Sequence, residues 1–65
     1  MNRLSIEKHL SVRFQTIANN YGLKTIGQLK AMLERMPPNG KLSLPMGHMR
    51  VAHVRNLLER ELESL

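Results

Sequence analysis

The residues best suited to bind an anion fall into two short segments of the 65-residue chain. Arg13 lies outside the apolar stripe of a segment with helical spacing, so its side chain can meet phosphate or a DNA groove. Gly47 precedes the last amphipathic segment, where a tight hairpin would present backbone N–H groups to an anion at a helix start. His48 and Arg50 follow at once, and both side chains can donate hydrogen bonds to phosphate. The pattern predicts an anion-binding surface.

Each of these residues also has an ordinary structural explanation. Exposed Arg side chains are common on helices, and a Gly before a helix is often only a turn residue. Met46 and Met49 flank Gly47, and because Met is flexible and polarizable, their exposure would favour a protein partner. The residues alone therefore leave nucleic-acid binding and protein binding both open.

The chain offers little for catalysis or metal binding. It contains no Cys, and its five carboxylates are mostly in the tail, with no nucleophile paired to a base. His48 and His53 are five positions apart, which separates them by about 140° on a helix at ~100° per residue, so they are badly placed to share a metal. The four glycines are dispersed and form no phosphate-binding loop. We expect no enzyme activity, no metal and no cofactor.

The charge of +5 is unevenly distributed. Residues 1–55 carry nine Lys or Arg against Glu7 and Glu34, which gives +7, whereas residues 56–65 carry one Arg against three Glu, which gives −2. Such a basic body favours a polyanion, because each neutralised phosphate releases condensed counterions. A charge of this size is also ordinary for a soluble surface.

Helices are the elements that would position these side chains. Ser11 can cap a first helix that Gly22 ends, and Thr25 can cap a second that residues 37–40 end. A last helix should begin near residues 48–50 and run to about Leu62. The predicted apolar faces are Leu10, Phe14, Ile17, Ala18 and Tyr21 for the first helix, Ile26, Leu29, Leu33 and Met36 for the second, and Val51, Val54, Leu58 and Leu62 for the last.

Leu42 and Leu44 alternate as in a short strand, but one isolated strand would have no partner, so residues 41–46 are predicted as loop or a single helical turn. The expected fold class is therefore all-α, a compact bundle of three to four short helices. We expect a single domain over residues 1–65, with 1–9 as an N-terminal arm and 10–62 as the helical core. The first residues lack the apolar run of a signal peptide, and the chain lacks one long enough to span a membrane, so we expect a cytoplasmic protein.

Two motifs and their spacing resemble one known family. Leu10-Ser-Val-Arg13 and Ile26-Gly-Gln-Leu29 match the signatures that open the first two helices of the carboxy-terminal domain of the bacterial RNA polymerase α subunit. Pro45-Met-Gly-His-Met-Arg50 stands where that family has a hairpin before its last helix, with Gly47 retained. The resemblance covers residues from about 6 to 62.

The resemblance implies a helical unit with a helix-hairpin-helix-like element that binds the minor groove of A·T-rich DNA in transcription. By this likeness Arg13 would enter the groove, and Gly47 with the following N–H groups would hold a phosphate. His48 and Arg50 would position phosphates. Thr16 stands where the family has a base-contacting Asn. The expected DNA-binding residues are therefore Arg13, Thr16, Gly47, His48 and Arg50, with Lys24 and Arg55 extending the positive field.

The sequence also departs from the family. His48 and Met49 replace two basic residues after the hairpin Gly, and the connection from Lys30 to Leu44 is about three residues longer and contains a double proline. These departures favour an alternative, a protein-interaction domain of the same fold that has lost DNA binding. It would use Met46 and Met49 to dock a polymerase component or a transcription regulator.

Overall fold

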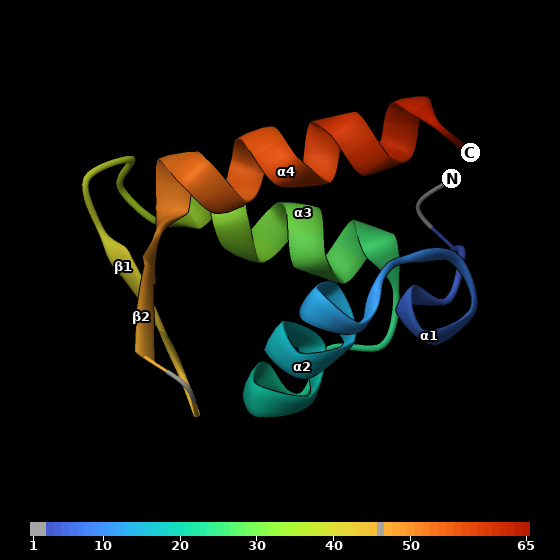
Figure 1. Cartoon of the computed structure of the whole chain (residues 1–65), viewed down its shortest axis with the longest axis horizontal. Helices are drawn as coiled ribbons and strands as arrows, with labels where there is room; N and C mark the ends of the chain where they lie inside the picture. The colour runs from blue at the N-terminus through green and yellow to red at the C-terminus, as the bar shows by residue number, and fades with distance from the viewer. Residues whose placement is uncertain (1–2, 46) are drawn as a thin grey trace.

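The structure, a computed structural model, describes residues 3–45 and 47–65. Within these residues the chain forms four helices and one two-stranded sheet. Figure 1 shows the hairpin at one end of the molecule and α1 at the other. The elements in chain order are α1 (Ile6–His9), α2 (Val12–Tyr21), α3 (Ile26–Arg35), β1 (Lys41–Leu44), β2 (Gly47–Arg50) and α4 (Val51–Glu63).

A single apolar core joins these elements, and it is built from the predicted helix faces. Phe14 of α2 is fully buried, and most residues of all three predicted stripes are buried with it. The exceptions are Met36 and Leu62, which are half-buried, and Tyr21, which is exposed. The buried apolar residues are Ile6, Leu10, Phe14, Ile17, Ala18, Ile26, Leu29, Leu33, Leu42, Val51, Val54 and Leu58.

The predicted helix boundaries around α2 and α3 are confirmed. Gly22 adopts the left-handed conformation (φ 69°) at the end of α2, and its N–H donates to the carbonyl of Ala18. Thr25 caps α3 in a capping box, because its hydroxyl accepts the N–H of Gln28 (3.2 Å) while the Gln28 side chain accepts the N–H of Thr25 (3.3 Å). Helix α3 ends at Arg35, just before the double proline.

The N-terminal arm packs into the domain through its backbone. The N–H of Ile6 donates to the carbonyl of Lys24 (3.0 Å), and the N–H of Ile26 donates to the carbonyl of Leu4 (3.0 Å). Ile6 is buried, and the arm forms the short helix α1. Through buried Ile6 and partly buried Leu4, the arm thus joins the same core as α2 and α3.

The expectation of an all-α fold is wrong, because residues 41–44 and 47–50 pair as the two strands of an antiparallel β-hairpin. Leu42 is opposite Met49, and Leu44 is opposite Gly47. The prediction of loop or a single helical turn for residues 41–46 rested on the lack of a partner strand, and residues 47–50 supply that partner. Because residues 47–50 are extended, α4 begins at Val51, just after the predicted start near residues 48–50. Gly47 (φ 136°) adopts a conformation that L side chains rarely take.

Candidate functional site

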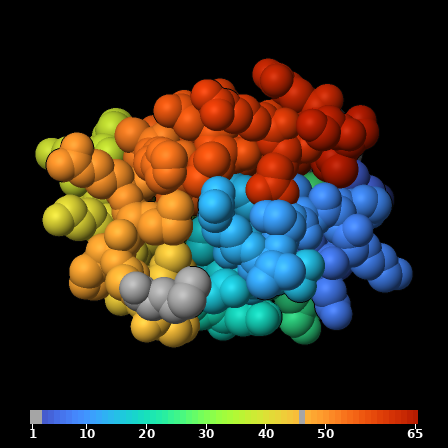
Figure 2. Space-filling model, viewed as in Figure 1, coloured from blue at the N-terminus to red at the C-terminus, as the bar shows by residue number. Residues whose placement is uncertain are grey.

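A shallow groove of about 410 Å³ runs between α2 and the hairpin and contains most of the predicted site. Figure 2 shows this side of the molecule, where the hairpin (yellow to orange) borders α2 (cyan). Of the residues predicted to bind DNA, only Arg50 does not line the groove, and Met46 lies outside the described residues. The lining residues are Val12, Arg13, Thr16, Leu44, Gly47, His48 and Met49.

Helix α2 presents the polar wall of the groove. Its buried residues, among them Phe14 and Ile17, face the core, which leaves Arg13 exposed and Thr16 half-buried on the groove side. Ser11 is the N-cap residue of α2 as predicted, but its side chain makes no cap hydrogen bond to the helix backbone. Instead the carboxylate of Glu61 of α4 accepts the N–H of Ser11 (2.8 Å) and the Ser11 hydroxyl (2.9 Å). A negative charge at a helix N-terminus is stabilising, so Glu61 fixes the turn from which Arg13 projects.

The other end of α2 holds the hairpin in place. The hydroxyl of Tyr21 accepts the N–H of Ser43 (2.9 Å), and the side-chain amide of Asn20 donates to the Ser43 carbonyl (2.5 Å). The N–H and the carbonyl of Ser43 are therefore both hydrogen-bonded to side chains of α2, as they would be to the backbone of a neighbouring strand. This contact sets the distance between the two walls of the groove.

Val12 and Leu44 line the groove but were not singled out from the sequence. Val12 is 73% exposed, and together with Leu44 and Met49 it gives the groove an apolar lining. Val12 falls outside the predicted apolar stripe of α2. Its apolar character outside that stripe was the signal in the sequence that could have pointed to this lining.

The expected anion cradle at the start of the last helix is not formed as predicted. Gly47 begins β2, four positions before α4, and Arg50 is the N-cap residue of α4. The first two N–H groups of α4 already have acceptors, because Val51 donates to the carbonyl of Gly40 (2.9 Å) and Ala52 donates to that of Pro38 (3.3 Å). The N–H groups of Val51 and Ala52 thus bind the residues just before β1 and so hold the base of the hairpin together.

Neither Lys24 nor Arg55 lines the groove. Arg55 is half-buried, its Nε donates to the carbonyl of Leu33 (3.1 Å), and its Nη2 donates to the carbonyls of Leu33 and Met36 (3.0 Å for Met36). Arg55 therefore binds the C-terminal end of α3 and ties α4 to it. The expectation that it adds to an exposed positive field is wrong for a guanidinium held in this way.

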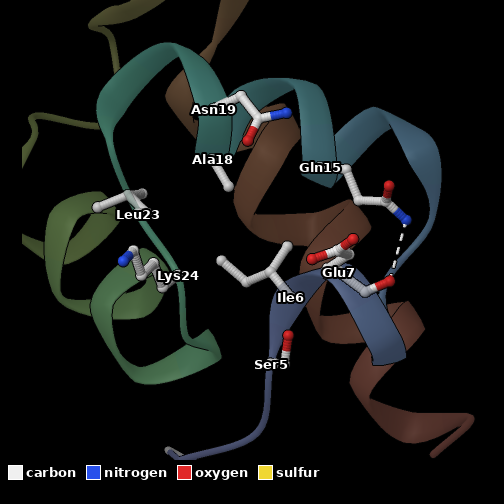
Figure 3. A pocket seen from close by; sticks show the side chains of 8 residues that line it. All are labelled: Ser5, Ile6, Glu7, Gln15, Ala18, Asn19, Leu23 and Lys24. Atoms are coloured by element: carbon white, nitrogen blue, oxygen red, sulfur yellow. Dashed lines mark hydrogen bonds between the residues drawn. The ribbon is translucent and has the colours of Figure 1, made fainter.

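Lys24 borders a second hollow of about 480 Å³ between α1, α2 and the loop that follows α2. Figure 3 shows Ile6 among the side chains that line it, with Gln15 donating to the carbonyl of Glu7 (3.2 Å). The same amide donates to the carbonyl of Leu10 (3.2 Å), so Gln15 secures the end of α1. The Gln15 amide that lines this second hollow thus stabilises the fold. None of the residues predicted to bind DNA lines the hollow.

The described residues contain no group of three or more His, Cys, Asp or Glu side chains that could hold a metal ion. His9, His48 and His53 lie on α1, β2 and α4 and are exposed. In residues 3–45 and 47–65, no helix combines the length and apolar character needed to cross a membrane.

Comparison with models of known protein families, with curated proteins and with solved structures found no match to this chain. The resemblance to the polymerase α domain therefore rests on its short motifs.

Proposed function

We propose that this protein is a non-enzymatic DNA-binding module that acts in transcription in the cytoplasm and contacts the minor groove and phosphates of A·T-rich duplex DNA. One observation carries the proposal: Arg13 and Thr16 of α2 line the same groove as Gly47 and His48 of the hairpin, although the two pairs are far apart in sequence. Four residues selected from the sequence as DNA contacts thus converge on one exposed face.

The exposed side chain of Arg13 and the groove lining beside it support this proposal. Arg13 is exposed beside the groove, and a narrow A·T-rich minor groove has the deepest negative potential, which favours an Arg side chain without base-specific hydrogen bonds. Proteins that bind the minor groove also frequently insert apolar side chains between base steps. The apolar lining beside Arg13 is compatible with such a contact.

Fluorescence anisotropy with an A·T-rich duplex and a G·C-rich control, at two salt concentrations, tests the proposal. Arg13→Ala is expected to weaken binding of the A·T-rich duplex by about 10-fold, consistent with a contact worth ~1.4 kcal/mol. Arg35→Ala removes an equal charge from the exposed end of α3 and should have a smaller effect. Equal affinity of Arg13→Ala and Arg35→Ala at moderate salt would remove Arg13 from the proposed role.

A second candidate, a protein-docking domain, is favoured by the apolar side chains that line the same groove from both α2 and the hairpin. Val12 is 73% exposed beside Leu44 and Met49, and exposed apolar patches often mark protein contacts. In this alternative a polymerase component or a transcription regulator occupies the groove. Val12→Lys separates the two functions, because an added cation strengthens duplex binding whereas a charge in an apolar interface abolishes protein docking.

A further inference from the structure

The outer face of the hairpin is cationic. Side chains alternate between the two faces of a strand, and in β1 and β2 the inner positions hold buried Leu42 and half-buried Leu44 and Met49. The outer positions, which we call the cationic face, are all exposed and include no acidic residue. They are Lys41, Ser43, His48 and Arg50.

The hydrogen-bond pattern of the hairpin brings two of these cations into close opposition. The N–H of Val51 donates to Gly40 across the hairpin, whereas both backbone groups of Ser43 point away from β2 toward α2. Because hydrogen-bonded and non-hydrogen-bonded pairs alternate along an antiparallel ladder, Lys41 and Arg50 form a non-hydrogen-bonded pair. In such pairs the Cα atoms are only about 4.5 Å apart, and the side chains are closer than in the other kind.

Two like charges directly opposite each other destabilise a hairpin. The acidic residues of the chain lie on α1, α3 and α4, so none of them is within the hairpin to compensate Lys41 and Arg50. A bound anion removes this repulsion, and the ammonium and guanidinium groups of this cross-strand pair can both donate to the oxygens of one phosphate. His48 lies on the same face two residue pairs further along the hairpin, and it also lines the groove, so it connects the cationic face to Arg13.

We infer that the hairpin is a phosphate-binding arm, in which Lys41 and Arg50 together hold one backbone phosphate of the duplex while Arg13 contacts the minor groove. This inference rests on the proposed function and adds a second contact surface to it. The contact carries no sequence information, because phosphates are the same at every base pair. It should therefore strengthen binding of A·T-rich and G·C-rich duplexes by the same factor.

The expected size of the contact follows from counterion release. Each neutralised phosphate contributes about 0.9 to the slope of log affinity against log salt. At 0.1 M salt, one such contact therefore raises affinity about 8-fold relative to 1 M salt. Loss of the Lys41–Arg50 contact should lower affinity by about this factor at 0.1 M and should reduce the slope by about 0.9.

Lys41→Glu tests the inference, because it should change stability and binding in opposite directions. It replaces a like-charge pair by an opposite-charge cross-strand pair, so the melting temperature should rise by about 1 to 4 °C. The same substitution should weaken binding of both duplexes by about 8-fold or more and reduce the salt slope. Lys8→Glu is the matched control, since it makes the same charge change on α1, at the opposite end of the molecule (Figure 1).

Each result has a distinct meaning. Weaker binding by Lys41→Glu than by Lys8→Glu, with a raised melting temperature, supports the phosphate-binding arm. Equal binding by these two variants, while Arg13→Ala still weakens the A·T-rich complex, overturns the arm and leaves the proposed function in place. If the unmodified protein binds neither duplex at low salt, both proposals fail, and an acidic protein segment becomes the candidate for the cationic face.

Discussion

Replacing Arg55 by Ala should destabilise the protein far more than removing other cations of α4. The guanidinium donates to the carbonyls of Leu33 and Met36 at the end of α3. A hydrogen bond from a charged donor contributes about 1.5 kcal/mol or more, but the half-buried position admits water to the abandoned carbonyls. Two acceptors therefore give a loss of about 2 to 3 kcal/mol, or roughly 10 to 20 °C in melting temperature for a domain of this size.

Thermal and urea unfolding followed by circular dichroism measure this loss. Arg60→Ala is the matched control, because it removes the same charge from an exposed position of the same helix and should cost about 0.5 kcal/mol or less. Arg55→Lys should be intermediate, since an ammonium cannot reproduce the planar fork of donors. If Arg55→Ala and Arg60→Ala unfold at the same temperature, Arg55 does not tie α4 to α3. At a temperature where both variants are folded, Arg55→Ala should bind duplex DNA as well as Arg60→Ala does.

Three further substitutions test how the ends of α2 and α3 are held, each measured as the free energy of urea unfolding. Glu61→Gln should cost about 1 kcal/mol, because Ser11 and the start of α2 lose a negatively charged acceptor. The control Glu63→Gln, at an exposed position, should be nearly neutral. Equal effects of the two substitutions would refute the role of Glu61 at the start of α2. Gly22→Ala should cost about 1 to 2 kcal/mol, because an L residue is strained at this positive φ. No atom lies within 4 Å of an added Cβ, so no steric clash adds to this cost. An unchanged stability would mean that α2 ends differently in solution. Thr25→Ala should cost about 1 kcal/mol through loss of the capping box, and a cost near zero would show that the cap is not formed.

The helices were predictable because their signals are local. The stripe from Leu10 to Ala18, the left-handed Gly22 and the Thr25–Gln28 capping box each lie within a few residues of the element that they define. Their physical causes are side-chain periodicity and the backbone groups left free at helix ends. The sequence therefore predicted α2, α3 and the body of α4 close to their observed bounds.

The hairpin was not predicted, because it can be recognised only when residues 41–44 and 47–50 are considered together. Leu42 and Leu44 showed the alternation of a strand, but residues 47–50 continue into an apolar helical stripe and were interpreted as its start. A Gly near the junction of two extended stretches is a recognised hairpin signal, and Gly47 is at this junction, as the first residue of β2. It was outweighed by the helical spacing of Val51, Val54 and Leu58.

The site was predictable in its residues and less so in its geometry. Arg13, Thr16, Gly47 and His48 do line one groove, which the order of the motifs anticipated. The binding of Arg55 to the end of α3 depends on packing between two helices, and no local pattern encodes it. Likewise, the opposition of Lys41 and Arg50 follows only from the strand register.

The binding of Ser43 by α2 also determines how the protein meets other copies of itself. Asn20 and Tyr21 bind the backbone of Ser43 on one edge of the hairpin, so strand addition is blocked there and we consider the edge of β2. By the alternation of the ladder, the backbone groups on that edge belong to His48 and Arg50. Two copies pairing edge to edge would therefore have to place these side chains against each other, and this repulsion opposes aggregation, as charged residues on edge strands do in many proteins. Concentrated salt screens the repulsion, so self-association should increase under the same conditions that weaken binding to a polyanion.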